Sequence, residues 1–220
     1  MFSTSLTALG YRGDQVPNEL RETKTMATRL AVLVPGFGYS CDMPLFYYIE
    51  NVLIDAGVDV LRLNTRYNEN PTFRDATDDE RFQWAIKDLT AVVRAGLDRR
   101  EYTELLLIGK SLGTAAITGL LLEGSPNQIA TRVVWLTLLL AIEDFRGRFA
   151  QIEVPGLVVI GTADAHYDEA ILNELLSQPH LTGCVIPDGD HSLDIPGNTR
   201  ASIAALATAI QAIASFLSLE

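Results

Sequence analysis

Short apolar runs alternate with longer amphipathic segments along most of the chain. The apolar runs predict buried β-strands at residues 29–34, 58–63, 105–108, 132–139, 157–160 and 183–186. Between them, apolar positions recur every three or four residues, which predicts helices at residues 44–55, 112–122 and 170–176, a helix that starts at residue 78, and a closing helix through residues 203–217. This alternation predicts an α/β fold, with a mostly parallel sheet of about seven or eight strands flanked by helices on both faces.

The N-terminal part, residues 1–28, departs from this pattern. Residues 3–9 and 17–25 predict a hairpin with its turn near residues 10–14, which would lead into the sheet. No repeat, low-complexity tract or long linker divides the chain. Residues 1–220 are therefore expected to form a single domain.

Chemically suggestive residues follow several of the predicted strands. The strand at 105–108 runs into Gly109-Lys110-Ser111-Leu112-Gly113, a G-x-S-x-G motif that opens a predicted helix. Asp164 follows the strand at 157–160, and His191 follows the strand at 183–186. Right-handed crossovers place the loops after parallel strands at one edge of the sheet, where ligands bind. These three side chains are therefore expected to meet.

The motif with its glycines, the Gly161-Thr162-Ala163-Asp164 turn and the Gly189-Asp190-His191-Ser192 loop, in that chain order, resemble the α/β-hydrolase fold superfamily, and within it a small serine esterase without a lid. The resemblance covers the chain from about residue 29 to its end. It implies that Ser111 is the nucleophile, that His191 is the general base and then the general acid, and that Asp164 orients the imidazole.

The same resemblance implies an oxyanion hole made by backbone N–H groups. We predict the N–H of Leu112, which follows the nucleophile, and that of Phe37 in the loop after the strand at 29–34. The family loop usually starts with His-Gly, whereas this chain has Pro35-Gly36, but a backbone donor does not depend on that side chain. Gly38, Tyr39 and Tyr67 lie in loops at the same edge and are candidates for contact with the substrate.

Several alternatives stay open at this stage. Ser111 could instead cap the helix at 112–122, because serine is favoured at that position. Some members of the superfamily take the triad acid after the preceding strand, where this chain has Glu143 and Asp144. Gly109-Lys110-Ser111 also resembles the end of a phosphate-binding loop, but that motif needs a glycine where the chain has Glu104, so nucleotide binding is not expected.

The amino-acid composition limits the classes of molecule that the protein is expected to bind. The formal net charge is −11 and the isoelectric point is about 4.7, which argues against nucleic acids and anionic membranes as partners. The N-terminus has no signal-peptide pattern and no apolar run is long enough to span a membrane, so a cytoplasmic protein is expected. Cys41 and Cys184 have no metal-site spacing and are expected to be reduced thiols. Neither a metal nor a cofactor is expected, and the oligomeric state is left open.

These expectations define two functional hypotheses. The first is a serine hydrolase that cleaves a small ester, thioester or related acyl substrate through an acyl-enzyme. The stretch at residues 140–156 is too short for a lid, which favours small or protruding acyl groups over long-chain lipids. The second is a catalytically silent protein that binds a ligand or a partner on the same fold, since fold alone does not guarantee activity.

Overall fold

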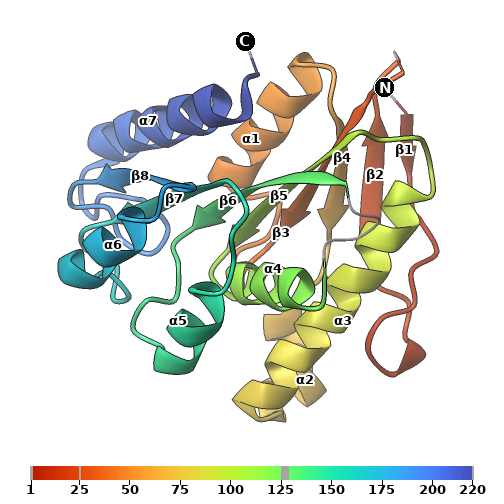
Figure 1. Ribbon diagram of the computed structural model, residues 1–220, viewed down its shortest axis with the longest axis horizontal. Helices are drawn as coiled ribbons and strands as arrows, with labels where there is room; N and C mark the ends of the chain where they lie inside the picture. The colour runs from red at the N-terminus through yellow and green to blue at the C-terminus, as the bar shows by residue number, and fades with distance from the viewer. Residues whose placement is uncertain (1, 25, 125–128, 220) are drawn as a thin grey trace.

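An eight-stranded sheet runs through the centre of the molecule (Figure 1). It is seen in a computed structural model that describes residues 2–24, 26–124 and 129–219. In spatial order, the strands are β1 (Phe2–Thr4), β2 (Asn18–Glu22), β4 (Asp59–Leu63), β3 (Arg29–Val34), β5 (Glu104–Lys110), β6 (Ala130–Leu136), β7 (Gly156–Gly161) and β8 (Leu181–Ile186). β1 and β2 are antiparallel to their neighbours, and β3 to β8 are parallel. The prediction of a mostly parallel sheet is confirmed.

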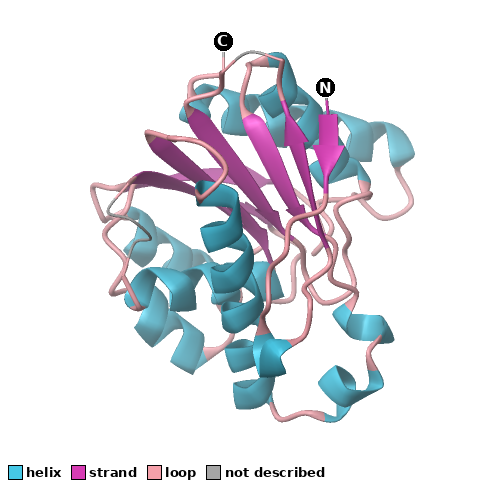
Figure 2. Cartoon of the chain, turned by 90° about the vertical axis from the view of Figure 1, so that its right-hand side faces the viewer, coloured by secondary structure: helices cyan, strands magenta, loops and turns pink. Residues whose placement is uncertain are grey.

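Helices cover both faces of this twisted sheet (Figure 2). They are α1 (Pro44–Asp55), α2 (Pro71–Asp75), α3 (Asp78–Leu97), α4 (Leu112–Leu122), α5 (Glu143–Phe149), α6 (Glu169–Leu176) and α7 (Thr199–Leu217), with short 3-10 turns η1 (Tyr11–Gly13) and η2 (Tyr67–Glu69). α1 and α7 pack their apolar side chains on one face, and α3 to α6 pack on the other. The two faces therefore carry separate hydrophobic cores.

β5 lies in the middle of the sheet and brings the G-x-S-x-G motif to its carboxyl edge. Its Leu107 pairs with Val32 of β3 and with Val133 of β6. Residues 105–110 are all buried, so the strand reads as one apolar run that ends in a lysine. Ser111 therefore follows directly after the end of a central, fully buried strand.

The predicted helices at 44–55 and 112–122 coincide with α1 and α4. α3 begins at Asp78 because Thr77 forms a capping box with Glu80. The predicted N-terminal hairpin is present, but its strands are shorter, since residues 5–17 mostly form a long connection between β1 and β2. The short helices α2 and α5 were not predicted, because polar residues 64–77 and the stretch 140–156 carry little helical periodicity.

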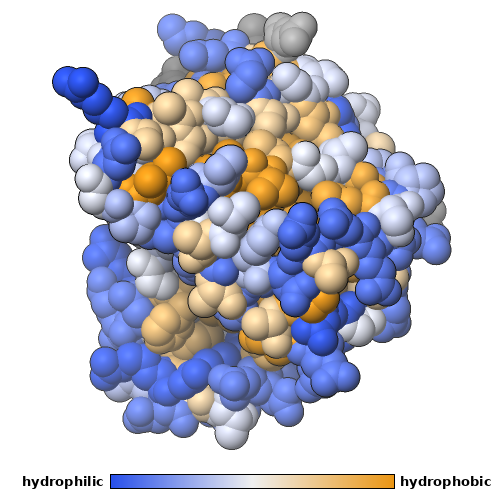
Figure 3. All heavy atoms as spheres, turned by 90° about the vertical axis from the view of Figure 1, so that its left-hand side faces the viewer, coloured by the Kyte–Doolittle hydropathy of each residue, from blue (hydrophilic) through white to orange (hydrophobic). Residues whose placement is uncertain are grey.

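By length and composition, α7 is the single described helix apolar enough to span a membrane. In the fold it lies against α1, β7 and β8, and it turns Ala205, Ala209, Ile213 and Leu217 inward. The apolar spacing that predicted this helix starts at Ile203, but Ile203 is 63% exposed and does not belong to the buried face. Alanines allow the helix to approach its neighbours closely, and the inward face follows them instead. Figure 3 views the molecule from the left-hand side of Figure 1, and it shows apolar surface gathered in the upper part of that face, where α7 and β8 lie.

Candidate active site

The turn between β5 and α4 holds Ser111 in an uncommon backbone conformation. Its φ is 52° and its ψ is −117°, a region that residues with a side chain rarely occupy. The Ser111 N–H donates to the carbonyl of Leu136 at the end of β6, at 3.0 Å. The side chain makes no capping hydrogen bond to α4. The alternative that Ser111 serves as a helix cap is therefore not what the geometry shows.

Two glycines allow this sharp turn. A Cβ on Gly113 would lie 2.2 Å from the carbonyl oxygen of Val34, so only glycine lets α4 pass so close to the end of β3. A Cβ on Gly109 would lie 2.9 Å from the Gly113 backbone. The two glycines of the motif therefore have a steric reason, since each stands where a side chain would collide with neighbouring backbone.

Asp164 and His191 come together from two different loops. Asp164, in the turn after β7, accepts a hydrogen bond of 2.8 Å from Nδ1 of His191, which lies in the loop after β8. The two loops are tied by the Ala163 N–H, which donates to the carbonyl of Gly189 at 2.9 Å. This is the pairing that holds an imidazole in one tautomer and leaves its Nε2 available as a base.

The carboxylate of Asp164 is buried, and burial alone would raise its pKa. Hydrogen bonds from His191 and from the backbone N–H of His166 outweigh this and hold the pKa of Asp164 below its usual value. Asp164 is thus ionised and able to stabilise an imidazolium. His166 was not singled out as a site residue from the sequence, although it follows Asp164 by two positions, and its ring centroid lies 5.5 Å from that of His191.

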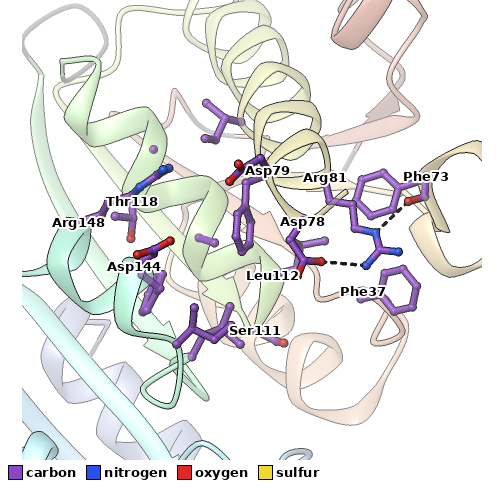
Figure 4. Close-up of a pocket in the computed structure, with 17 residues that line it drawn as sticks. Phe37, Phe73, Asp78, Asp79, Arg81, Ser111, Leu112, Thr118, Asp144 and Arg148 are labelled. Atoms are coloured by element: carbon purple, nitrogen blue, oxygen red, sulfur yellow. Dashed lines mark hydrogen bonds and ion pairs between the residues drawn. The ribbon is translucent and has the colours of Figure 1, made fainter. Parts of the chain in front are cut away.

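Ser111 lies at one end of a pocket of about 300 Å³ (Figure 4). Most of its wall is apolar and comes from the loop after β3, from α2, α3, α4 and α5 and from the segment before α5: Phe37, Phe73, Phe82, Ile86, Leu112, Ala115, Leu139, Ile142 and Phe145. Charged residues also line it, namely Asp78, Asp79, Arg81, Asp144 and Arg148. Arg81 is held by Asp78 and by the carbonyl of Phe73, as the dashed lines in Figure 4 show.

The predicted oxyanion donors lie beside the same pocket. Phe37 and Leu112 both line it, and the loop with Phe37 passes over the serine, because a Cβ on Gly36 would lie 3.3 Å from the Ser111 Cβ. Among the described hydrogen bonds, none uses the backbone N–H of Phe37 or of Leu112. An oxyanion hole requires backbone donors of this kind, so the two N–H groups stay candidates for that role. Among the described residues, the side chain of His191 hydrogen-bonds Asp164, and no hydrogen bond joins it to Ser111.

The three predicted substrate contacts lie away from this pocket. Tyr67 is buried and its hydroxyl donates to Asp88 Oδ2 at 2.9 Å, so it packs under the loop rather than at the edge. The Tyr39 hydroxyl accepts from the Leu45 N–H at the start of α1. Gly38 is exposed next to Phe37 and does not line the pocket.

The other acids proposed for the triad begin α5. Asp144 lines the pocket and both Glu143 and Asp144 are exposed, while the hydrogen bond to His191 comes from Asp164. Cys41 and Cys184 are both free thiols. Burial raises the pKa of Cys41 to about 12, so this thiol is protonated and not a nucleophile at neutral pH.

The wall of the pocket is what the sequence analysis missed. Phe82 and Ile86 lie on α3, the helix predicted to start at residue 78, and the face that they share continues from the core into the pocket. Phe73 and Phe145 lie on the two short helices that carry no clear periodic signal.

The sheet order, the strand-end residues and the short connection between β6 and β7 define an α/β hydrolase without a lid. A family model described as an alpha/beta hydrolase domain matches residues 27–218, and the chain belongs to this family. No curated protein sequence matches the chain significantly.

Solved structures share the fold at low sequence identity. One is XC6422 from Xanthomonas campestris, described as an α/β serine hydrolase without a lid, at 21% identity and a TM-score of 0.71 over 97% of this chain and 94% of that chain. A second is a dienelactone hydrolase from Anabaena variabilis, at 19% identity and a TM-score of 0.74 over 97% and 95%. A third is Est1E from Butyrivibrio proteoclasticus, at 14% identity and a TM-score of 0.67 over 98% and 100%. The family, together with these neighbours, supports a hydrolase.

Proposed function

We propose that the protein is a serine hydrolase that cleaves a small ester, thioester or related acyl compound through an acyl-enzyme. The observation that carries the proposal is the strained Ser111 at one end of an apolar pocket, together with an Asp164–His191 pair in two loops at the same edge of the sheet. Strained backbone in the wall of a pocket points to function rather than to stability.

In this mechanism the Ser111 hydroxyl attacks the acyl carbon while Nε2 of His191 takes its proton. The carbonyl oxygen gains negative charge and accepts hydrogen bonds from the N–H groups of Leu112 and Phe37. His191 then gives its proton to the leaving alkoxide or thiolate, and the acyl group remains on Ser111. Water, deprotonated by His191, releases the acid and restores the hydroxyl. Asp164 keeps the imidazole oriented throughout.

The pocket supports a substrate with a compact apolar acyl group. A volume of about 300 Å³ is at the small end of the range of ligand pockets, and its wall is largely aromatic and aliphatic. No lid lies between β6 and β7, where residues 137–155 hold only α5 among their helices and strands. We therefore expect short-chain or single-ring acyl groups to react faster than long-chain ones.

Labelling with a fluorophosphonate probe tests the nucleophile. The wild-type protein is expected to take up one label per chain, and Ser111→Ala is expected to take up none. Labelling that persists in Ser111→Ala would contradict the assignment. His191→Ala should lose turnover of p-nitrophenyl butyrate while keeping its fold, as judged by circular dichroism.

A series of p-nitrophenyl esters from acetate to palmitate tests the substrate class. We expect kcat/KM to be highest for short acyl chains and to fall at least tenfold by palmitate. A folded protein that neither takes up the probe nor turns over any ester, thioester or amide in such a panel would favour the catalytically silent alternative.

A further inference from the structure

Lys110 is a buried cation directly beneath the proposed active site. It is the last residue of β5 and only 1% exposed. Leu106 and Ile108, which precede it on the same side of the strand, belong to the apolar core under α1 and α7. A charged side chain at the end of such a row is costly to bury, so its contacts need an explanation.

The ammonium group contacts three segments that follow three different strands. Its Nζ donates to the main-chain carbonyl of His191 at 2.5 Å and to Oγ1 of Thr137, after β6, at 3.0 Å. It also lies 4.8 Å from the centre of the Tyr39 ring, in the loop after β3. No carboxylate forms an ion pair with it among the described residues. One of its two hydrogen bonds is therefore to the backbone of the residue proposed as the base.

We propose that Lys110 is a positioning residue, whose ammonium group fixes the loop of His191 relative to the serine turn by holding the His191 carbonyl. The inference rests on the proposed function, because it assigns His191 as the base. Lys110 is the residue directly before Ser111, and its side chain holds the loop that carries His191. One residue therefore connects the turn of the nucleophile with the loop of the base. A base displaced by about 1 Å can cost a hundredfold in rate.

The conformation of Thr137 supports this assignment. Thr137 is fully buried and has a φ of 51°, an unfavourable value for a β-branched residue. Its N–H donates to the carbonyl of Val159 in β7. Leu193, two residues after His191, also has a positive φ of 63°. A strained backbone persists only where the surrounding structure holds it in place. Thr137 is itself a partner of Lys110, and Leu193 lies in the loop whose His191 carbonyl accepts from Lys110.

The charge environment gives the proposal a pH-dependent readout. The titratable groups that face the ammonium are Asp164 after β7, Asp190 and His191 after β8, and Tyr39. Burial lowers the pKa of Lys110 to about 8, against the opposing effect of Asp164 and Asp190. As the pH rises through this value, the group loses its charge and its hydrogen bond to the His191 carbonyl weakens.

The test compares Lys110→Met, Lys110→Arg and the exposed control Lys87→Met by ester hydrolysis between pH 6 and 10. We expect the wild-type rate to decline above about pH 8. We expect Lys110→Met to lower kcat about tenfold to a hundredfold with little change in KM, and to lack this alkaline decline. Lys110→Arg, which stays charged, should recover part of the rate without that decline. Lys110→Met within twofold of the wild type, with the same pH profile, would overturn the proposal.

Two further measurements keep the test decisive. If Lys110→Met does not fold, a pair of variants at Thr137 replaces it. Thr137→Val removes the hydroxyl that accepts from the ammonium group, and Thr137→Ser keeps that hydroxyl. Equal kcat values for these two variants would count against the proposal. The chain has only three histidines, so the imidazole signals can be resolved by NMR. A shift of the His191 signal in Lys110→Met is expected even if the wild type proves inactive on every substrate, which separates this inference from the proposed reaction. An unmoved signal would refute it.

Discussion

Ser111 carries a side chain in a backbone region that glycine prefers. Strain of this kind costs about 1–3 kcal/mol. We expect Ser111→Gly to be more stable than Ser111→Ala by about 1 kcal/mol, even though glycine gains entropy in the unfolded chain. Both variants lack the hydroxyl, so urea unfolding compares them without an effect of activity. If Ser111→Ala is equally stable or more stable, the turn is not strained in solution.

A substitution at Tyr67 tests whether this residue has a structural role or a role in substrate binding. Its hydroxyl is buried and donates to Asp88, whose other oxygen accepts from the Tyr11 N–H. Tyr67→Phe removes one hydrogen bond from a buried carboxylate, and we expect a loss of about 1–3 kcal/mol in the free energy of unfolding. The KM for short esters should not change. The exposed Tyr47→Phe is the control and should alter neither quantity; a raised KM in Tyr67→Phe would restore Tyr67 as a substrate contact.

The elements that the sequence predicted are those in which one physical signal dominates. β5 and β7 are continuous apolar runs because both of their faces are covered, and α3 shows its start through the Thr77 capping box. The meeting of Asp164 and His191 could also be predicted, since crossover handedness places the ends of parallel strands at one edge of the sheet. The pocket wall could not. Phe73 and Phe145 come from short helices that are stabilised by packing and carry no periodic pattern of their own.

The partners of Lys110 could not be predicted from the sequence in the same way, because a lysine normally reaches solvent. The strand alternation places its side chain on the α1 and α7 face, where the carbonyl of His191 and the hydroxyl of Thr137 satisfy it. Those partners follow other strands, so no local pattern around residue 110 reveals them.

The contact between α4 and the end of β3 predicts the effect of adding one methyl group. In Gly113→Ala the new Cβ would lie 2.2 Å from the Val34 carbonyl oxygen, so α4 must shift. We expect a loss of at least about 2 kcal/mol in stability and loss of probe labelling, because the shift moves Ser111 and the Leu112 N–H. The matched control is Gly147→Ala in α5, where nothing lies within 4 Å, and it should be neutral or stabilising. Labelling at the wild-type rate in Gly113→Ala would contradict the close approach.

Buried tyrosine hydroxyls make the stability of the whole molecule depend on alkaline pH. Burial raises the pKa of Tyr39 to about 12, and it also raises the pKa values of Tyr67, which lies beside Asp88, and of Tyr102, which lies beside Asp59. Below pH 10 these hydroxyls are protonated in both states, so they do not alter stability. Above pH 10 the unfolded chain loses protons that the folded protein keeps, and the free energy of unfolding should fall. Lys110, with its lowered pKa, acts in the opposite direction between about pH 8 and 10.5.

Urea unfolding at pH 7 to 11 measures this dependence. We expect stability to hold or rise up to about pH 10 and to fall beyond it, and we expect three of the seven tyrosines to ionise late in a titration followed at 295 nm. Tyr102→Phe should show a shallower fall above pH 10, because one of the three contributions is gone, whereas the exposed Tyr48→Phe should keep the wild-type slope. A stability curve that stays flat to pH 11 would mean that these hydroxyls reach solvent, and the cores beneath the two helical layers would then be looser than the structure shows.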